Sequence, residues 1–215
     1  MIRQRSLLIG FGVLAWLVTA ALPASAEWVT DLYLGAAITQ KEDVTIKIAG
    51  VGASEKVNFD TSFTLGARVG YWFEGLPWLG LALDASFFNP DADLTVYPIS
   101  PLLMLRWPLF TSTQFPKGQL QPYAGVGPGL FISTTKIDLR PELEATFSDT
   151  SIDFGLDVRA GLAWLFAKNT AFFVEYRFTH VRPSFEDHVG FANLRTTVET
   201  NLNTHHLLGG ISFRF

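Results

Sequence analysis

The feature that most constrains the fold is a long run of alternating residues from Ser151 to Phe166. One set reads Ile152, Phe154, Leu156, Val158, Ala160, Leu162, Trp164 and Phe166, and the intervening set includes Asp153, Asp157 and Arg159. A period of two is the pattern of a β-strand with one apolar face and one polar face. Strands of soluble proteins average about five or six residues, whereas a tilted strand needs about 9 to 11 residues to cross hydrocarbon. The length of the run therefore favours a membrane-spanning strand.

The same alternation recurs along the chain and predicts eight strands in one all-β domain. We expect these strands at residues 28–38, 62–73, 79–87, 97–107, 123–133, 151–166, 172–178 and 205–215. The connections 40–60, 134–150 and 181–204 are long, whereas 74–77 and 167–170 are tight. Long outer loops and short periplasmic turns are typical of an antiparallel up-and-down transmembrane β-barrel. Two connections depart from this rule, since 89–95 is short for an outer loop and 108–119 is long for a turn.

The first 26 residues have the three parts of a secretory signal peptide. Arg3 and Arg5 precede an apolar run from Leu7 to Leu22, and Ala24-Ser25-Ala26 is a small-residue cleavage site. The apolar run is shorter than the ~20 residues that a membrane-spanning helix needs. We therefore expect export with cleavage after Ala26, and one domain over residues 27–215, rather than an uncleaved membrane anchor.

Composition excludes several other classes of protein. The 215 residues include 20 acidic and 16 basic side chains, so the formal charge is −4 and there is no basic excess to hold nucleic acid. The chain has no cysteine, which excludes disulfide scaffolds and thiolate metal sites. With 48% hydrophobic residues, the chain is too apolar to be disordered. We expect no cofactor.

Aromatic side chains gather near the ends of the expected strands, where they would form two girdles at the membrane interfaces. They are Trp28, Tyr71, Trp72, Phe73, Trp78, Phe87, Phe88, Tyr97, Trp107, Tyr123, Phe131, Trp164, Phe166, Phe172, Phe178, Phe213 and Phe215. The general preference of aromatic residues for strands explains part of this pattern, but not their concentration at strand ends.

The C-terminal stretch from His205 to Phe215 resembles the closing strand of Gram-negative outer-membrane proteins, with a terminal Phe and apolar residues at alternate positions before it. Together with Pro122-Tyr123-Ala124-Gly125-Val126-Gly127 and Val174-Glu175-Tyr176-Arg177-Phe178, it makes residues 27–215 similar to the small eight-stranded barrels related to the OmpA transmembrane domain. The resemblance implies a place in the cell outer membrane, in contact with its lipid and lipopolysaccharide. It also implies that the barrel-assembly machinery reads Ile211, Phe213 and Phe215.

If the apolar sets face lipid, the opposite faces of the strands carry five acidic and five basic side chains. They are Asp31, Arg68, Asp84, Arg106, Asp153, Asp157, Arg159, Glu175, Arg177 and Arg214. Eight strands leave an interior just wide enough for side chains to fill, so we expect these charges to pair and to plug the barrel. Such a cluster is also a candidate catalytic or proton-relay site, but no nucleophile stands beside an obvious base.

Enzymes of this architecture offer a second comparison. A family of outer-membrane lipid A deacylases uses a His and a Ser two residues apart, together with a Glu. Here the residue two positions after His180 is Arg182, and Ser184 and Glu186 follow in an expected loop. This departure removes the specificity of the motif, so we predict that the protein is not an enzyme. His205 and His206 do not form a metal site, because neighbours in a strand point to opposite faces.

The sequence predicts a structural and surface-interaction role for a monomeric barrel. Its long loops, such as 40–60 and 134–150, would bind a host or phage ligand, because loops on a rigid scaffold can vary without risk to the fold. The alternatives are a small-solute or lipid transporter, a lipid A-modifying enzyme, and a soluble lipocalin-like barrel whose polar face lies outside.

Three prolines stand where a closed barrel should disfavour them: Pro98 and Pro101 in the fourth strand, and Pro128 in the fifth. Proline lacks the N–H group that a strand ladder needs. If the connecting turn is centred near Thr113, residue 101 lies opposite about residue 125, which places the prolines close together in the outer half of the membrane. The missing donors predict either a local bulge or a lateral gap through which a lipid tail or apolar solute could pass.

Overall fold

The computed structural model describes residues 27–40, 42–48, 51–57, 61–91, 94–138, 146–182, 184–189, 194–199 and 201–215. The expected signal peptide lies outside these residues. Within them, no helix is long and apolar enough to cross a membrane.

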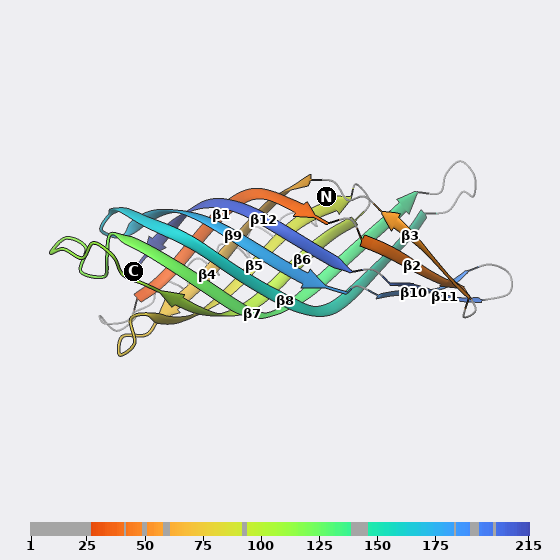
Figure 1. The fold of residues 1–215 in the computed structure, drawn as a ribbon, viewed down its shortest axis with the longest axis horizontal. Helices are drawn as coiled ribbons and strands as arrows, with labels where there is room; N and C mark the ends of the chain where they lie inside the picture. The colour runs from red at the N-terminus through yellow and green to blue at the C-terminus, as the bar shows by residue number, and fades with distance from the viewer. Residues whose placement is uncertain are drawn as a thin grey trace, which may run out of the picture.

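Eight strands form a closed antiparallel barrel in the order β1-β12-β9-β8-β7-β6-β5-β4 (Figure 1). They are β1 (Glu27–Thr39), β4 (Thr61–Trp72), β5 (Leu79–Asp91), β6 (Leu94–Arg106), β7 (Leu120–Asp138), β8 (Thr146–Ala167), β9 (Thr170–Val181) and β12 (Leu202–Arg214). Each expected strand corresponds to one of these, so the predicted eight-stranded up-and-down barrel is confirmed. Strands β7 and β8 run further than expected, to 19 and 22 residues.

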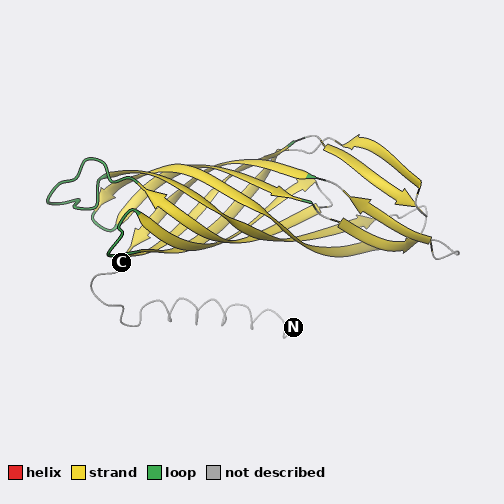
Figure 2. Ribbon diagram, turned by 60° about the horizontal axis from the view of Figure 1, so that its bottom comes forward, coloured by secondary structure: helices red, strands yellow, loops and turns green. Residues whose placement is uncertain are grey.

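Two of the connections that we expected to be loops contain strands, so that expectation was wrong. Residues 40–60 hold β2 (Glu42–Ile48) and β3 (Val51–Val57), and residues 181–204 hold β10 (Ser184–Val189) and β11 (Leu194–Glu199). These four strands form a separate sheet in the order β10-β11-β2-β3, beyond one end of the barrel (Figure 2). The sheet depends on pairing between β11 and β2, which are far apart in the sequence. Local alternation carries no signal for such a pairing.

The barrel closes where the first strand meets the last. Strands β1 and β12 pair without a break from Val29↔Arg214 to Thr39↔Thr204. At the rim that we expect to face the periplasm, the N–H of Trp28 donates to the carbonyl of Phe215 at 3.2 Å, and the N–H of Phe215 donates to the carbonyl of Trp28 at 3.0 Å. If the paired residues are followed from strand to strand once around the barrel, the path returns to β1 displaced by about ten residues. A stagger of this size corresponds to a strand tilt of roughly 40° relative to the barrel axis.

The two faces of the wall have opposite character. Phe154 is 82% exposed and Val174 is 63% exposed on the outside, whereas Arg159 is 1% exposed on the inside. Apolar side chains therefore face lipid, which contradicts the lipocalin-like alternative. Four aromatic residues that we assigned to the girdles are instead buried in the interior, because they belong to the inward sets of their strands: Trp72, Phe88, Tyr123 and Phe131.

The ladder between β6 and β7 is interrupted once, at the prolines. Ile99 pairs with Leu130 and Leu103 pairs with Val126 in the same register, while the three positions between them are unpaired. This register sets Pro101 directly opposite Pro128. The expected partner, residue 125, was wrong because the bridge between Leu109 and Leu120 continues the same register and centres the turn past Thr113.

Pro98 interrupts the other side of the same strand. The β5–β6 ladder passes from Ala85↔Ile99 to Phe88↔Val96 without the pairs between them, whereas Pro98 itself pairs with Phe131 on β7. Strand β6 therefore loses backbone bonds to both of its neighbours in its outer half.

The close approach of β1 and β12 at the closure of the barrel can be tested by a substitution. A Cβ atom built on Gly35 would lie 2.0 Å from the carbonyl oxygen of Leu207, which no real Cβ contact allows. We predict that Gly35→Ala lowers the free energy of unfolding by about 1 to 3 kcal/mol, because β1 and β12 must move apart. Urea unfolding in detergent measures the change. Gly75→Ala is the control, since a Cβ there meets nothing within 4 Å, and equal losses in the two variants would contradict the prediction.

Candidate functional site: the charged interior

The middle of the barrel interior holds a layer of paired charges from strands on opposite sides. Alternation turns Asp31 of β1, Arg68 of β4 and Glu175 of β9 inward. The guanidinium of Arg68 bridges the two acids, with Nε 2.7 Å from Asp31 Oδ2 and Nη1 2.7 Å from Glu175 Oε2. The hydroxyl of Tyr123 donates to the same Glu175 oxygen at 2.8 Å. One arginine thus joins three strands across the lumen.

A second part of this layer lies on its outer side. Arg159 contacts three acids: Asp84 at 2.9 Å, Asp157 at 2.7 Å and Glu175 at 3.3 Å. Arg177 shares Asp157 at 2.7 Å and lies 3.5 Å from Asp84. All of these side chains are fully buried. Because each charge has at least one opposite partner, the layer avoids the cost of an unpaired buried ion.

Neutral groups complete the hydrogen bonding of this layer. The hydroxyl of Tyr33 donates to both oxygens of Asp84, at 2.8 and 2.9 Å. Arg177 Nη1 donates to the hydroxyl of Ser86 at 2.7 Å. Such bonds satisfy acceptors and donors that the ion pairs leave over, as buried polar groups require.

A second charged layer lies at the periplasmic mouth. The carboxylate of Glu27 contacts Arg106 at 2.7 Å, and Arg214 and Lys117 at 3.1 Å each. Gln121 accepts a hydrogen bond from Arg214 at 2.7 Å. Lys117 belongs to the long turn after β6, and Phe115 of the same turn is buried, so part of this turn covers the mouth.

Apolar side chains separate the charged layers and cover them. Between the two layers lie Val29, Trp72, Met104 and Phe173, among others. Toward the outer end, the interior is covered by Ala37, Phe88, Val96, Phe131, Val181 and Leu202. The ring of His206 packs edge-on against Phe88 beneath this cover, with ring centroids 5.0 Å apart. The charges are therefore sealed from outside by apolar packing.

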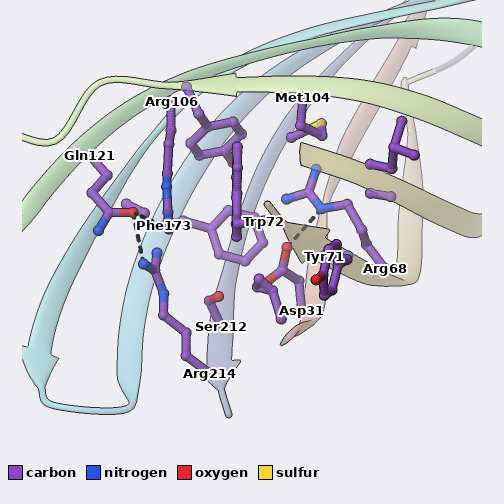
Figure 3. Close-up of a pocket in the computed structure, with 16 residues that line it drawn as sticks. Asp31, Arg68, Tyr71, Trp72, Met104, Arg106, Gln121, Phe173, Ser212 and Arg214 are labelled. Atoms are coloured by element: carbon purple, nitrogen blue, oxygen red, sulfur yellow. Dashed lines mark hydrogen bonds and ion pairs between the residues drawn. The ribbon is translucent and has the colours of Figure 1, made fainter. Parts of the chain in front are cut away.

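A chamber of about 40 Å³ remains between the two charged layers. Figure 3 shows Asp31 and Arg68 on one side of it, and Gln121 and Arg214 on the other. Asp31 Oδ1 and Arg214 Nε, both from residues that line this chamber, have no hydrogen-bond partner among the described side chains. A volume of this size suits ordered water.

The structure brings nine of the ten predicted interior charges into these layers as buried side chains. Asp153 is the exception: it is half-buried near the outer rim and is hydrogen-bonded by Ser151. The fifth acid of the layers is Glu27 instead of Asp153. The sequence analysis did not include Glu27 because this residue directly follows the expected cleavage site. The inward alternation of β1, in which Glu27, Val29, Asp31 and Tyr33 share one face, carries the signal for it.

The histidines, the residues that follow His180 and the C-terminal residues lie outside the two charged layers. His180 Nδ1 is 2.7 Å from Asn203 Oδ1, and Ser184 and Glu186 lie in strand β10 rather than in a loop. His206 is buried, whereas the neighbouring His205 faces outward. Ile211, Phe213 and Phe215 are all exposed on the lipid-facing side of β12 or at its end.

Comparison with known proteins agrees with this architecture. The sequence profile of the family "Outer membrane protein beta-barrel domain" matches residues 11–215. OprG from Pseudomonas aeruginosa has a similar structure, with 15% identity, a TM-score of 0.62 and coverage of 89% of this chain and 96% of that chain. Neisserial surface protein A is similar with 16% identity, a TM-score of 0.52 and coverage of 89% and 98%. No curated protein sequence matches this chain.

The closed barrel, its lipid-facing apolar wall and the profile match over almost the whole sequence lead to one conclusion. The chain belongs to the outer membrane protein β-barrel domain family of Gram-negative bacteria.

Proposed function

We propose that the protein is a non-enzymatic barrel with a structural and surface-interaction role, whose interior is plugged by its charged side chains. The observation that carries this proposal is the sealed interior: two layers of paired charges, an apolar cover, and a chamber of only about 40 Å³ between the layers. A barrel filled in this way serves as a rigid support rather than as an open pore.

The plug contributes more to the specificity of the fold than to its net stability. Desolvation of two charges offsets much of their attraction, but loss of one partner leaves an uncompensated buried ion, which costs about 3 to 5 kcal/mol. Arg159 and Asp84 lie on strands β8 and β5, which are not neighbours in the wall. The pair therefore favours the one strand arrangement in which its two members meet.

The binding surface in this proposal is the outer end of the barrel. There, β2, β3, β10 and β11 form a sheet beyond the rim, and the β7–β8 hairpin extends alongside it (Figure 1). Host or phage ligands and lipopolysaccharide are the proposed partners, because they are what this end of an outer-membrane barrel meets. The protein would act as a monomer, since its eight strands close on themselves without a second copy.

The proposal also covers how the barrel reaches its place. Cleavage after Ala26 would make Glu27 the first residue, and its contacts with Arg106 and Arg214 would then fix the new terminus at the periplasmic mouth. Recognition of Ile211, Phe213 and Phe215 by the assembly machinery would precede closure, because these side chains stand on the strand that pairs with β1.

The plug makes a stability prediction. Asp157→Asn removes the charge that Arg159 and Arg177 share, so we expect the free energy of unfolding in urea to fall by about 3 to 5 kcal/mol. Asp153→Asn is the matched control, with the same chemical change four residues away on the same strand. We expect it to cost less than about 1 kcal/mol, because Asp153 has no ion pair among the described residues. Similar losses in the two variants would refute the plug.

The plug also predicts how the protein conducts ions. In a planar bilayer, the natural protein should give no stepwise conductance, because Arg68 and Arg159 cross the lumen. The double variant Arg68→Ser/Arg159→Ser should give steps, provided that its heat-dependent gel mobility shows a folded barrel. Regular steps from the natural protein would overturn the proposal in favour of a channel.

A second candidate function, lateral transport of lipid tails or apolar solutes, is favoured by the interrupted β6–β7 ladder. Pro101 and Pro128 face each other there, so neither strand can donate to the other at that pair. The gap lies in a wall exposed to lipid, where unpaired backbone groups are costly. A Cβ built on Gly127 would nevertheless lie 1.9 Å from the Pro101 carbonyl oxygen, so the strands remain in close contact. Any opening would require them to separate.

Substitution of the facing prolines tests this second function. Pro101→Val/Pro128→Val restores two backbone donors, and we expect it to raise the midpoint of urea unfolding. If the gap is a transport route, the same double variant should slow uptake of an apolar fluorescent solute into reconstituted vesicles. Val126→Ala, on the same strand and also facing lipid, is the control. A stabilised variant with unchanged uptake would exclude the lateral route.

A further inference from the structure

Polar side chains accompany the outer aromatic girdle on one side of the barrel wall. Lipid-facing aromatic side chains lie near the outer ends of β4, β5, β6 and β9, namely Phe63, Phe87, Tyr97 and Phe178. Strands β9, β12 and β1 are neighbours in the wall (Figure 1). Polar residues occupy the outermost positions of their lipid-facing side. They are His180, Asn203 and His205, followed by Gln40 just past the end of β1.

The outward orientation of these side chains follows from their neighbours along each strand. Thr179 and Val181 flank His180 and are buried in the interior, as are Thr204 and His206 on either side of His205. The register places His180 opposite Asn203, and the N–H of Gln40 donates to the Asn203 carbonyl at 2.9 Å. Three strands therefore present one row of polar groups on the outer surface of the wall.

Hydrogen bonds hold this row in place. His180 Nδ1 donates to Asn203 Oδ1 at 2.7 Å, since an amide oxygen can only accept. Gln40 Nε2 donates to His205 Nε2 at 2.8 Å, and His205 Nδ1 is bonded to the hydroxyl of Tyr176 at 2.5 Å. We call these five residues, Gln40, Tyr176, His180, Asn203 and His205, the polar ridge.

A cation follows the polar ridge in the sequence, just past the end of β9. Arg182 follows His180 by two residues, and its side chain is exposed. Among the described contacts, neither Arg182 nor His180 Nε2 has a protein partner. A guanidinium carries five donors in a fork that matches phosphate, and an imidazole nitrogen can bond a hydroxyl group.

The position of the polar ridge in the wall limits which ligands it can bind. Polar side chains on the lipid face are unfavourable at the depth of hydrocarbon and become tolerable near the interface. The ridge occupies the level of the outer girdle, so its surroundings are the headgroups of the outer leaflet. A ligand there must offer a phosphate to Arg182 and hydroxyl groups to the imidazole and amides below it.

We propose that the polar ridge and Arg182 form a binding site for the phosphorylated sugar headgroup of an outer-leaflet glycolipid. Arg182 pairs with the phosphate, and His180 Nε2 accepts from a sugar hydroxyl. The site gives the proposed lipopolysaccharide contact a specific place on the wall, on strands β9, β12 and β1. It depends neither on the interior plug nor on the outer sheet, so it can fail while the proposed function stands.

Affinity for a defined glycolipid tests the site. The folded protein in detergent is titrated with diphosphoryl lipid A, and the bound fraction is measured by native mass spectrometry. We expect Arg182→Gln to weaken binding about tenfold, because a charge-assisted hydrogen-bond pair is lost. Arg182→Lys should retain most of the affinity. Lys168→Gln, which removes one positive charge from a turn at the opposite end of the barrel, should leave binding unchanged.

Three further arms distinguish the ligand classes. Phosphatidylglycerol carries a phosphate but no phosphorylated sugar, so it should bind more weakly than diphosphoryl lipid A. The variant His180→Phe should reduce this difference in affinity between the two lipids. Inorganic phosphate at millimolar concentration should not displace the glycolipid. Equal affinity of Arg182→Gln and the natural protein would overturn the site, as would equal binding of the two lipids or displacement by free phosphate. Heat-dependent gel mobility confirms that each variant is folded.

Discussion

Hydrocarbon offers no partner to a backbone N–H or C=O group, so the pairing of the first strand with the last is the constraint from which the rest of this structure follows. Trp28 and Phe215 exchange two backbone hydrogen bonds, and the β1–β12 ladder continues from there to the outer rim. Closure of eight tilted strands fixes a narrow interior. It also forces every strand to present one face to lipid and the other to that interior, which is why a period of two dominates the sequence.

A narrow interior determines which side chains can fill it. Arginine is long enough to reach across the lumen, and its five donors let one residue serve several acids from different strands. Arg159 does so with three acids, and Arg68 with two. The layers contain five acids and five arginines: Glu27, Asp31, Asp84, Asp157 and Glu175 with Arg68, Arg106, Arg159, Arg177 and Arg214. Such a balance lowers the cost of burial, because an unpaired buried charge is far more costly than a paired one.

The sequence predicts this architecture well where the signal is local. The alternation in β8 identifies both the strand and the inward direction of Asp157 and Arg159. Prediction from the sequence fails where a residue type suits either face of the wall, or where two strands that pair are far apart in the chain. Tyr123 is an aromatic residue near a strand end, and only its register reveals that it hydrogen-bonds Glu175 in the interior. Strands β2 and β11 pair across most of the chain, and no periodicity within either one indicates the other.

The interior layers and the interrupted ladder are connected by geometry. The strands around the interrupted ladder follow one another in the order β8-β7-β6-β5. An ion pair between β8 and β5 therefore spans β7 and β6, whose mutual backbone bonds are missing at Pro101 and Pro128. Arg159 and Asp84 form such a pair at 2.9 Å, and Arg177 on β9 reaches the neighbouring Ser86 on β5. Buried charge pairs of this kind act over a greater distance than one backbone bond and are little screened. These ion pairs join β5 and β8 behind the interrupted ladder, so the packing of the interior and a wall with facing prolines depend on the same side chains.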